Sequence, residues 1–227
     1  MTVKQLPLAL GLAPQPTLDS FITGANAAAL AHLRAWPERG APPVYLWGPS
    51  GCGKTHLARA LAEARQAAGR TVASFDAAAA LPWTVDADTG LILLDDCDGL
   101  DAARQQAAFA LFVESATFGL PLLAAGRLPP VDLPLREDLR TRLGWGHVFA
   151  LQPLDETQTR AALRDEAARR GIDLSDDVVG YLLTRFARDL KHLMALLDRI
   201  DGFALAAARP VTVPLLKQML VEEVAWS

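Results

Sequence analysis

The chain has 227 residues, of which 51% are hydrophobic and 21% are charged, and its formal net charge is −4 at pH 7. This composition is typical of a globular protein and excludes a disordered chain, and the length suits one large domain or two unequal ones. The absence of any block of consecutive basic residues argues against a surface dedicated to non-specific nucleic-acid binding, although it does not exclude a local basic patch. The two cysteines fit no disulfide or metal-binding pattern, and neither a membrane-spanning run nor a signal pattern occurs, so we expect a cytoplasmic protein with no membrane contact.

The first sixteen residues contain three prolines and a glycine, which disfavour a regular helix. We therefore expect residues 1–16 to form an extended tail. Helical spacing follows over residues 25–36 and ends at Pro37. A loop over residues 38–43 then leads into a short apolar run at 44–47, which is typical of a buried strand.

A phosphate-binding loop pattern, G-x-x-x-x-G-K-[ST], directly follows this predicted strand. Its residues are Gly48, Pro49, Ser50, Gly51, Cys52, Gly53, Lys54 and Thr55, and His56 continues into a segment of helical spacing that reaches about residue 68. The glycines allow backbone N–H groups to point inward at phosphate oxygens, while the lysine can reach the terminal phosphates and the threonine hydroxyl can bind Mg²⁺. A chance glycine-rich turn is the alternative. The order of strand, loop and helix favours a nucleotide site.

Further strand candidates at 71–75, 91–94 and 120–125 accompany a helix over 102–118, whose packing side we expect to carry Phe109, Phe112 and Val113. The segment 77–81 is ambiguous, because its alanines favour helix and Pro82 would end one quickly. Short strands that alternate with helices indicate a parallel sheet covered on both faces. Only helices are expected beyond residue 153, over 155–170, 175–185, 189–206 and 213–221. We therefore expect an α/β nucleotide-binding domain at 17–153 and a small all-helical domain at 154–227.

Two carboxylates, Asp95 and Asp96, directly follow the apolar run at 91–94. Ligand sites in parallel sheets gather at the carboxyl ends of the strands, where the phosphate loop also lies. We expect Asp95 to support a Mg²⁺ ion and Asp96 to orient the water that attacks the γ-phosphate. The alternative is a strand that simply ends in a polar turn, and the nearby Asp98 and Asp101 fit that interpretation.

The order of these features resembles the DnaA-type AAA+ ATPases, over nearly the whole chain. The matching segments are 17–21 with Gly24 and Asn26, then 45–57, 94–96, 139–146 and 188–193. The resemblance implies a P-loop AAA+ α/β fold followed by a helical lid, with ADP or ATP and Mg²⁺ as cofactors. Within this family the chain is most similar to Hda, the regulatory inactivators of DnaA, because it ends after the lid, where DnaA continues into a DNA-binding domain. We therefore expect no direct specific DNA binding.

The resemblance also implies roles for individual residues. Thr17, Phe21 and Asn26 match the segment that lines the adenine base, although Phe21 equally suits the core. Arg142 matches the arginine finger, a catalytic group that would reach the ATP of a neighbouring subunit. Lys191 falls where the family has a second sensor arginine, and lysine keeps the charge of that residue without its bidentate fork.

The chain departs from the family pattern after residue 123. The family has an Asp or Asn before Arg-Pro-Pro, whereas residues 124–130 read Ala-Ala-Gly-Arg-Leu-Pro-Pro. No polar side chain therefore stands where the family has its first sensor. We expect weak intrinsic ATP hydrolysis for this reason.

The tail contains a peptide similar to the one with which the Hda group docks on the DNA polymerase sliding clamp, its beta subunit. In this peptide Gln5 would form a hydrogen bond at the edge of a groove that Leu6, Leu8 and Leu10 fill. The family's proline in the fifth position is Ala9 here. A frayed terminus is the alternative.

These features together predict a nucleotide-gated negative regulator of DNA replication initiation. It would bind DnaA and the sliding clamp, and it would stimulate ATP hydrolysis by DnaA through Arg142 in trans. This arrangement favours side-by-side association, including that of two copies of the chain. A self-sufficient AAA+ ATPase, such as a helicase or clamp loader, and an interaction module with a purely structural nucleotide are the alternatives.

Overall fold

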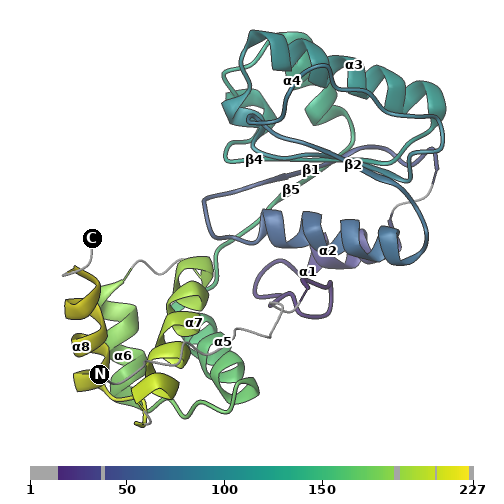
Figure 1. Ribbon diagram of the computed structural model, residues 1–227. Helices are drawn as coiled ribbons and strands as arrows, with labels where there is room; N and C mark the ends of the chain where they lie inside the picture. Colours follow the sequence, from purple (N-terminus) through teal and green to yellow (C-terminus); the bar gives the residue numbers. More distant parts are fainter. Residues whose placement is uncertain (1–14, 37–38, 187–189, 208, 225–227) are drawn as a thin grey trace, which may run out of the picture. The chain divides into compact units, whose positions relative to one another are not determined.

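A computed structural model describes residues 15–36, 39–186, 190–207 and 209–224 of the chain (Figure 1). The chain divides after Pro153 into two compact units, the first starting at Gln15 and the second at Leu154. The first unit combines a sheet with helices, whereas the described part of the second contains helices alone. The first unit contains two clusters of buried apolar side chains, and the second unit contains one of its own.

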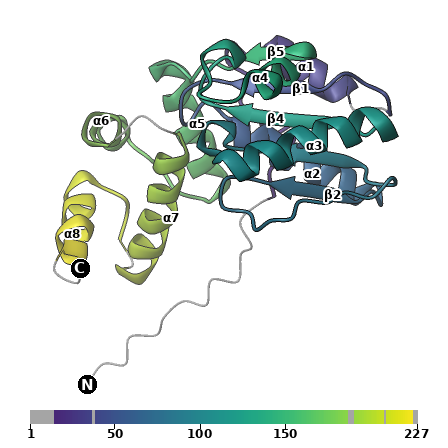
Figure 2. The same cartoon turned by 90° about the horizontal axis from the view of Figure 1, so that it is seen from above.

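The first unit is built on a five-stranded parallel sheet with the strand order β2-β3-β4-β1-β5 (Figure 2). Its strands are β1 (Val44–Trp47), β2 (Val72–Phe75), β3 (Leu91–Leu94), β4 (Leu122–Gly126) and β5 (His147–Ala150). The parallel α/β sheet that the sequence predicts is therefore confirmed. Because all the strands run in one direction, their carboxyl ends meet at the same edge of the sheet.

Helices cover both faces of this sheet, α1 and α2 on one face and α3 and α4 on the other (Figure 1). They are α1 (Ala27–Ala35), α2 (Lys54–Ala67), α3 (Ala102–Phe118) and α4 (Glu137–Trp145), with short 3₁₀ turns η1 (Cys97–Gly99) and η2 (Pro130–Asp132). One core cluster packs Leu30 and Leu57 against one side of the sheet, and a second packs Phe112 and Leu139 against the other. The apolar runs of β3 and β4 are buried on both sides for this reason.

The packing face of α3 differs from the expected one at Val113. This side chain is 42% exposed, and Phe109 is only half-buried. The buried positions are 108, 111, 112 and 115, which recur at the three- and four-residue spacing of one helix face. Position 113 lies about 100° around the helix from 112, so its valine turns toward solvent.

The second unit contains α5 (Glu156–Arg169), α6 (Asp176–Arg185), α7 (Leu190–Ala207) and α8 (Val213–Val224). Asp155 caps α5 in a reciprocal capping box with Gln158, and Ser175 occupies the N-cap position of α6 without a hydrogen bond from its side chain. The apolar faces of all four helices meet in a single cluster that includes Leu163, Leu182 and Leu197. Among the described residues, no helix combines the length and the apolar character needed to cross a membrane.

Candidate functional site

The phosphate loop joins β1 to α2, and two of its glycines are required by their surroundings. Gly48 and Gly53 have φ angles of 151° and 100°. A Cβ atom on Gly48 would lie 2.4 Å from the carbonyl oxygen of Leu151, and one on Gly53 would lie 2.5 Å from Cε2 of Phe21. Any other residue would therefore strain the backbone and displace its neighbour. The loop can keep its backbone close to a ligand only because no side chain intervenes.

Lys54 begins α2 and folds back over the loop. Its Nζ atom donates hydrogen bonds to the carbonyl oxygens of Gly48, at 2.7 Å, and of Pro49, at 3.0 Å. The same atom lies 3.7 Å from Sγ of Cys52, whose side chain is buried. Residues 49–51 form the exposed crest of the loop. An ammonium group and the positive end of a helix therefore face the same small volume, which suits a phosphate chain.

Thr55 and Asp95 connect this loop to the end of β3. The Thr55 hydroxyl donates a hydrogen bond of 2.9 Å to Oδ2 of Asp95, while Oδ1 of Asp95 accepts one of 2.9 Å from the backbone N–H of Asp96. Hydroxyl and carboxylate oxygens are the ligands that Mg²⁺ prefers, and this ion commonly keeps several waters. Thr55 and Asp95 thus have the chemistry to hold a Mg²⁺ ion beside the phosphate loop.

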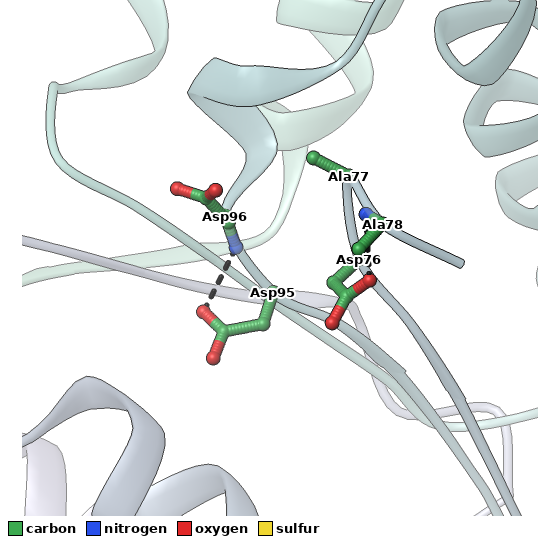
Figure 3. A pocket seen from close by; sticks show the side chains of 5 residues that line it. All are labelled: Asp76, Ala77, Ala78, Asp95 and Asp96. Atoms are coloured by element: carbon green, nitrogen blue, oxygen red, sulfur yellow. Dashed lines mark hydrogen bonds between the residues drawn. The ribbon is translucent and has the colours of Figure 1, made fainter.

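A hollow of about 320 Å³ lies at the carboxyl ends of β2 and β3, lined by Asp76, Ala77, Ala78, Asp95 and Asp96 (Figure 3). Oδ1 of Asp76 accepts hydrogen bonds of 2.8 Å from the backbone N–H groups of Ala78 and Ala79. The sequence reasoning missed Asp76, although its place directly after an expected strand was a signal comparable to that of Asp95. The hollow is therefore strongly acidic.

Asp96 has an unusual backbone for a residue with a side chain. Its φ and ψ angles of 52° and 46° lie in the left-handed region. Figure 3 shows its carboxylate pointing away from that of Asp95. Its Oδ2 atom would lie 3.0 Å from a Cβ atom on Gly99. The expected role of Asp96 in orienting water stays a prediction.

Residues 17–21 are tied to the first turn of α2. Thr17 and Ser20 exchange backbone-to-hydroxyl hydrogen bonds of 3.0 Å, and Nε2 of His56 lies 3.1 Å from the Thr17 carbonyl oxygen and 3.3 Å from the Ser20 hydroxyl. The rings of Phe21 and His56 are 5.7 Å apart, and Phe21 is buried against Gly53. This segment is therefore placed beside the phosphate loop, where the sequence resemblance puts the base.

Asn26 is engaged with the backbone of Gln152. Its Nδ2 atom donates to the Gln152 carbonyl oxygen at 2.9 Å, and its Oδ1 atom accepts from the Gln152 N–H at 2.8 Å. The side chain is only 4% exposed. These contacts give Asn26 a structural partner within the first unit, and the expected contact with the base stays a prediction.

Arg142 lies in the last turn of α4, away from the acidic hollow. Its guanidinium carbon is 5.7 Å from the centre of the Phe109 ring. Across the described residues it makes no ion pair, whereas Arg136, the N-cap residue of α4, pairs with Asp138 at 2.6 Å. A half-exposed guanidinium held only by an aromatic ring remains able to contact another molecule.

Four of the residues expected in binding sites lie outside the described part of the chain. They are the proposed clamp-binding residues Gln5, Leu6, Leu8 and Leu10. Lys191 lies in the first turn of α7, in the second unit.

Two family models match the chain. The model of the Hda lid domain matches residues 155–220, and that of the bacterial DnaA ATPase domain matches residues 12–76. The chain belongs to the DnaA-type AAA+ family. Within this family, the helical unit matches the lid domain of the Hda group. An uncharacterized protein of Haemophilus influenzae is 32% identical to it over 229 residues, covering 96% of this chain and 98% of that protein.

Solved structures of DnaA share the fold. Domain III of the Thermotoga maritima replication initiation protein DnaA is 18% identical with a TM-score of 0.74, over 93% of this chain and 98% of that one. AMPPCP-bound DnaA from Aquifex aeolicus is 22% identical with a TM-score of 0.69, over 83% of this chain and 66% of that one. The chain thus spans about two thirds of this DnaA. A RuvB mutant of T. maritima has a similar TM-score of 0.69 at 18% identity, over 92% of this chain and 73% of that one, so the fold is shared more widely.

Proposed function

We propose that this chain is a nucleotide-gated AAA+ regulator of DNA replication initiation, which binds ADP or ATP with Mg²⁺ at residues 48–55. The observation that carries the proposal is the 2.9 Å hydrogen bond between Thr55 and Asp95. It joins the start of the phosphate-loop helix to the acidic end of β3, which supports the proposal that these two segments form one nucleotide–metal site. Membership of the DnaA-type family and the AMPPCP-bound DnaA from A. aeolicus favour an adenine nucleotide.

The roles of this chain's residues follow from their chemistry. The loop N–H groups would bind phosphate oxygens, and Lys54 would exchange its carbonyl partners for the terminal phosphates. Thr55 and Asp95 would hold Mg²⁺, which neutralises charge on the phosphate oxygens when bound. The segment 17–21, tied by His56, would face the base. Gly126, at the end of β4, has no side chain to act on the terminal phosphate, which supports weak hydrolysis by the chain alone.

We further propose that Arg142 acts in trans on ATP held by DnaA. Arg142 rests on Phe109 without a carboxylate partner among the described residues, so offering its guanidinium to another molecule breaks no ion pair. An arginine supplied across an interface stabilises charge on the transferring phosphoryl group, and such fingers raise turnover by roughly 10³–10⁵-fold. Because donor and acceptor sites differ, the association would be side by side, and two copies of this chain could associate in the same way.

Docking on the sliding clamp through residues 5–10 completes the proposal. Its support comes from the sequence pattern alone, because these residues lie outside the described part. An extended peptide that places alternate leucines in an apolar groove is a common mode of recognition. Bound there, the chain would meet DnaA near replicating DNA, where promoting ATP hydrolysis would leave the initiator inactive.

The proposal is tested by the rate of ATP hydrolysis by DnaA in the presence of clamp loaded on DNA. The intact chain should stimulate this hydrolysis, and Arg142→Ala should abolish the stimulation. Arg136→Ala is the matched control, because it removes the arginine at the N-cap of α4, which already pairs with Asp138. Stimulation by Arg142→Ala equal to that of the intact chain would refute the finger. Rapid turnover by the isolated chain would instead favour a self-sufficient ATPase.

A further inference from the structure

Arg127 is the first residue after β4, and its position in the sheet places it at the proposed nucleotide site. In the strand order, β4 lies between β3, which leads into Asp95, and β1, which leads into the phosphate loop. Gly126 pairs with Trp47 in the register of β4 and β1. The carbonyl oxygen of Gly126 accepts a 3.3 Å hydrogen bond from the N–H of Gly48. The chain beyond Gly126 therefore emerges between the phosphate loop and the acidic end of β3.

The position before it cannot carry a side chain. A Cβ atom on Gly126 would lie 2.3 Å from the hydroxyl oxygen of Tyr45. This tyrosine is buried in β1, and its hydroxyl donates a 2.8 Å hydrogen bond to the carbonyl oxygen of Leu128. Burial raises the pKa of the Tyr45 phenol, so the group stays a neutral donor. Of residues 126 and 127, only Arg127 can therefore offer a polar side chain to a ligand.

Asp98 holds Arg127 in place. The backbone N–H of Arg127 donates to Oδ1 of Asp98 at 2.8 Å, and the Nε–H of its guanidinium donates to Oδ2. The Asp98 side chain is 7% exposed, whereas that of Arg127 is 64% exposed. Burial opposes the charge of Asp98, but the hydrogen bonds from Arg127 outweigh it and lower the pKa of this carboxyl group. A buried, charged carboxylate thus fixes one end of an exposed guanidinium.

The outer end of this guanidinium is available for a ligand. With Nε engaged, the two terminal amino groups of Arg127 have no hydrogen-bond partner among the described residues. The contact with Asp98, three residues beyond Asp95 in the chain, holds the guanidinium beside the acidic segment that follows β3. Two parallel N–H donors of a guanidinium match the spacing of phosphate oxygens, and a cation here offsets the repulsion between those carboxylates and a phosphate.

We propose that Arg127, positioned by Asp98, contacts the terminal phosphate of a bound nucleoside triphosphate and makes the site prefer triphosphate over diphosphate. This inference rests on the proposed nucleotide site. In this proposal the guanidinium of Arg127 takes the place of the polar side chain that Gly126 lacks. Asp98 acts here as a positioning residue, because it touches Arg127 and not the nucleotide.

The test is calorimetric titration of the full chain with Mg²⁺ and either AMPPCP or ADP. Arg127→Ala should weaken AMPPCP binding roughly tenfold or more and change ADP binding by less than about twofold, since only the triphosphate loses a charge-assisted contact. Arg127→Lys should recover part of the loss, because it restores the charge without the fork. Asp98→Asn should reduce AMPPCP binding selectively. Arg160→Ala, which removes a half-buried arginine of α5 that pairs with Glu156, should change the binding of neither ligand.

Each result decides the proposal. Equal weakening of both ligands by Arg127→Ala, or no weakening of AMPPCP, overturns the role of Arg127 while leaving nucleotide binding by the intact chain in force. Failure of the intact chain to bind either ligand overturns both proposals. If Arg127→Ala lowers the melting temperature below the temperature of the titration, Arg127→Gln takes its place, because glutamine keeps a donor for Asp98. An unchanged ratio of AMPPCP to ADP affinity in Arg127→Gln would then also overturn the role of Arg127.

Discussion

Both polar atoms of the Asn26 side chain bind the backbone of Gln152, 126 residues further along the chain. This pair of hydrogen bonds joins the residue before α1 to the residues that follow β5. Leu151, next to Gln152, also contacts the phosphate loop, since its carbonyl oxygen limits the space at Gly48. The hydrogen bonds between Asn26 and Gln152 therefore stabilise the segment after β5 that packs against the phosphate loop.

Asn26→Ala should lower the free energy of unfolding by about 2 kcal/mol or more, because it leaves two backbone groups without partners near a buried position. Urea unfolding followed by circular dichroism measures this change. Gln152→Ala is the matched control, because both bonds use the backbone of residue 152 and survive the substitution. Equal destabilisation by the two variants would contradict the assignment.

Lys54→Ala should weaken the binding of ADP at least tenfold, because a charge-assisted hydrogen bond to phosphate is lost. The fold should survive, since the partners of this ammonium are carbonyl oxygens of an exposed loop. Titration with ADP and a thermal melt test both statements. Lys217→Ala, which removes a lysine near Tyr181 in the second unit, should leave ADP binding intact. Undiminished binding by Lys54→Ala would exclude this loop as the phosphate site.

His56→Ala should weaken ADP binding and leave the binding of inorganic triphosphate nearly unchanged. The ring of His56 ties Thr17 and Ser20 to α2, so its loss frees the segment proposed to face the base while the phosphate loop keeps its glycines. Competition of both ligands against a fluorescent nucleotide gives the two affinities. Parallel losses for the two ligands would mean that His56 supports the loop itself.

The stability of the fold should fall as the pH drops below 6.5, through His32. Burial, and next the charge of His147, lower the pKa of His32 from its ordinary value of 6.5. The unfolded chain therefore takes up a proton at this residue before the folded chain does, so stability is retained above pH 6.5 and lost below it. The two rings are 4.3 Å apart.

His32→Phe should flatten this pH dependence in thermal melts between pH 7.5 and roughly pH 5, because the titrating group is absent. The ring nitrogen Nε2 of His32 is buried without a hydrogen-bond partner in the described part of the chain, so phenylalanine should be tolerated there. His192→Gln, which removes an exposed histidine, should keep the full dependence. A dependence that survives His32→Phe unchanged would assign the effect to other groups.

Gln5→Ala combined with Leu10→Ala should remove binding to the sliding clamp and leave ADP binding unchanged. The proposed peptide contacts the clamp through these side chains and takes no part in the nucleotide site. Surface plasmon resonance with immobilised clamp measures the loss, with Thr2→Ala in the same tail as the control. Normal clamp binding by the double variant would refute the docking peptide.

Local patterns were sufficient to predict much of this fold. The strands at 44–47 and 91–94 and the helix at 102–118 agree with the structure residue for residue, because an unbroken apolar run or a regular helical spacing is a property of neighbouring residues. The phosphate loop was likewise predictable, since its glycines serve a local backbone shape. The strand β5 was missed because it lies at the sheet edge and is largely exposed, so its sequence lacks a buried run.

The sequence by itself determined most of the helices and strands, the phosphate loop and the family of this protein, because these depend on short segments and their order. Only the tertiary structure decided which side chains meet. Thr55 reaches Asp95 across 40 residues, and Asp98 fixes Arg127 across 29. Such pairs arise from the placement of β4 between β3 and β1, which brings three strand ends together at one edge. The steric exclusion of a side chain at Gly126 by Tyr45 has the same origin, since the two residues are neighbours only through the packing of the sheet.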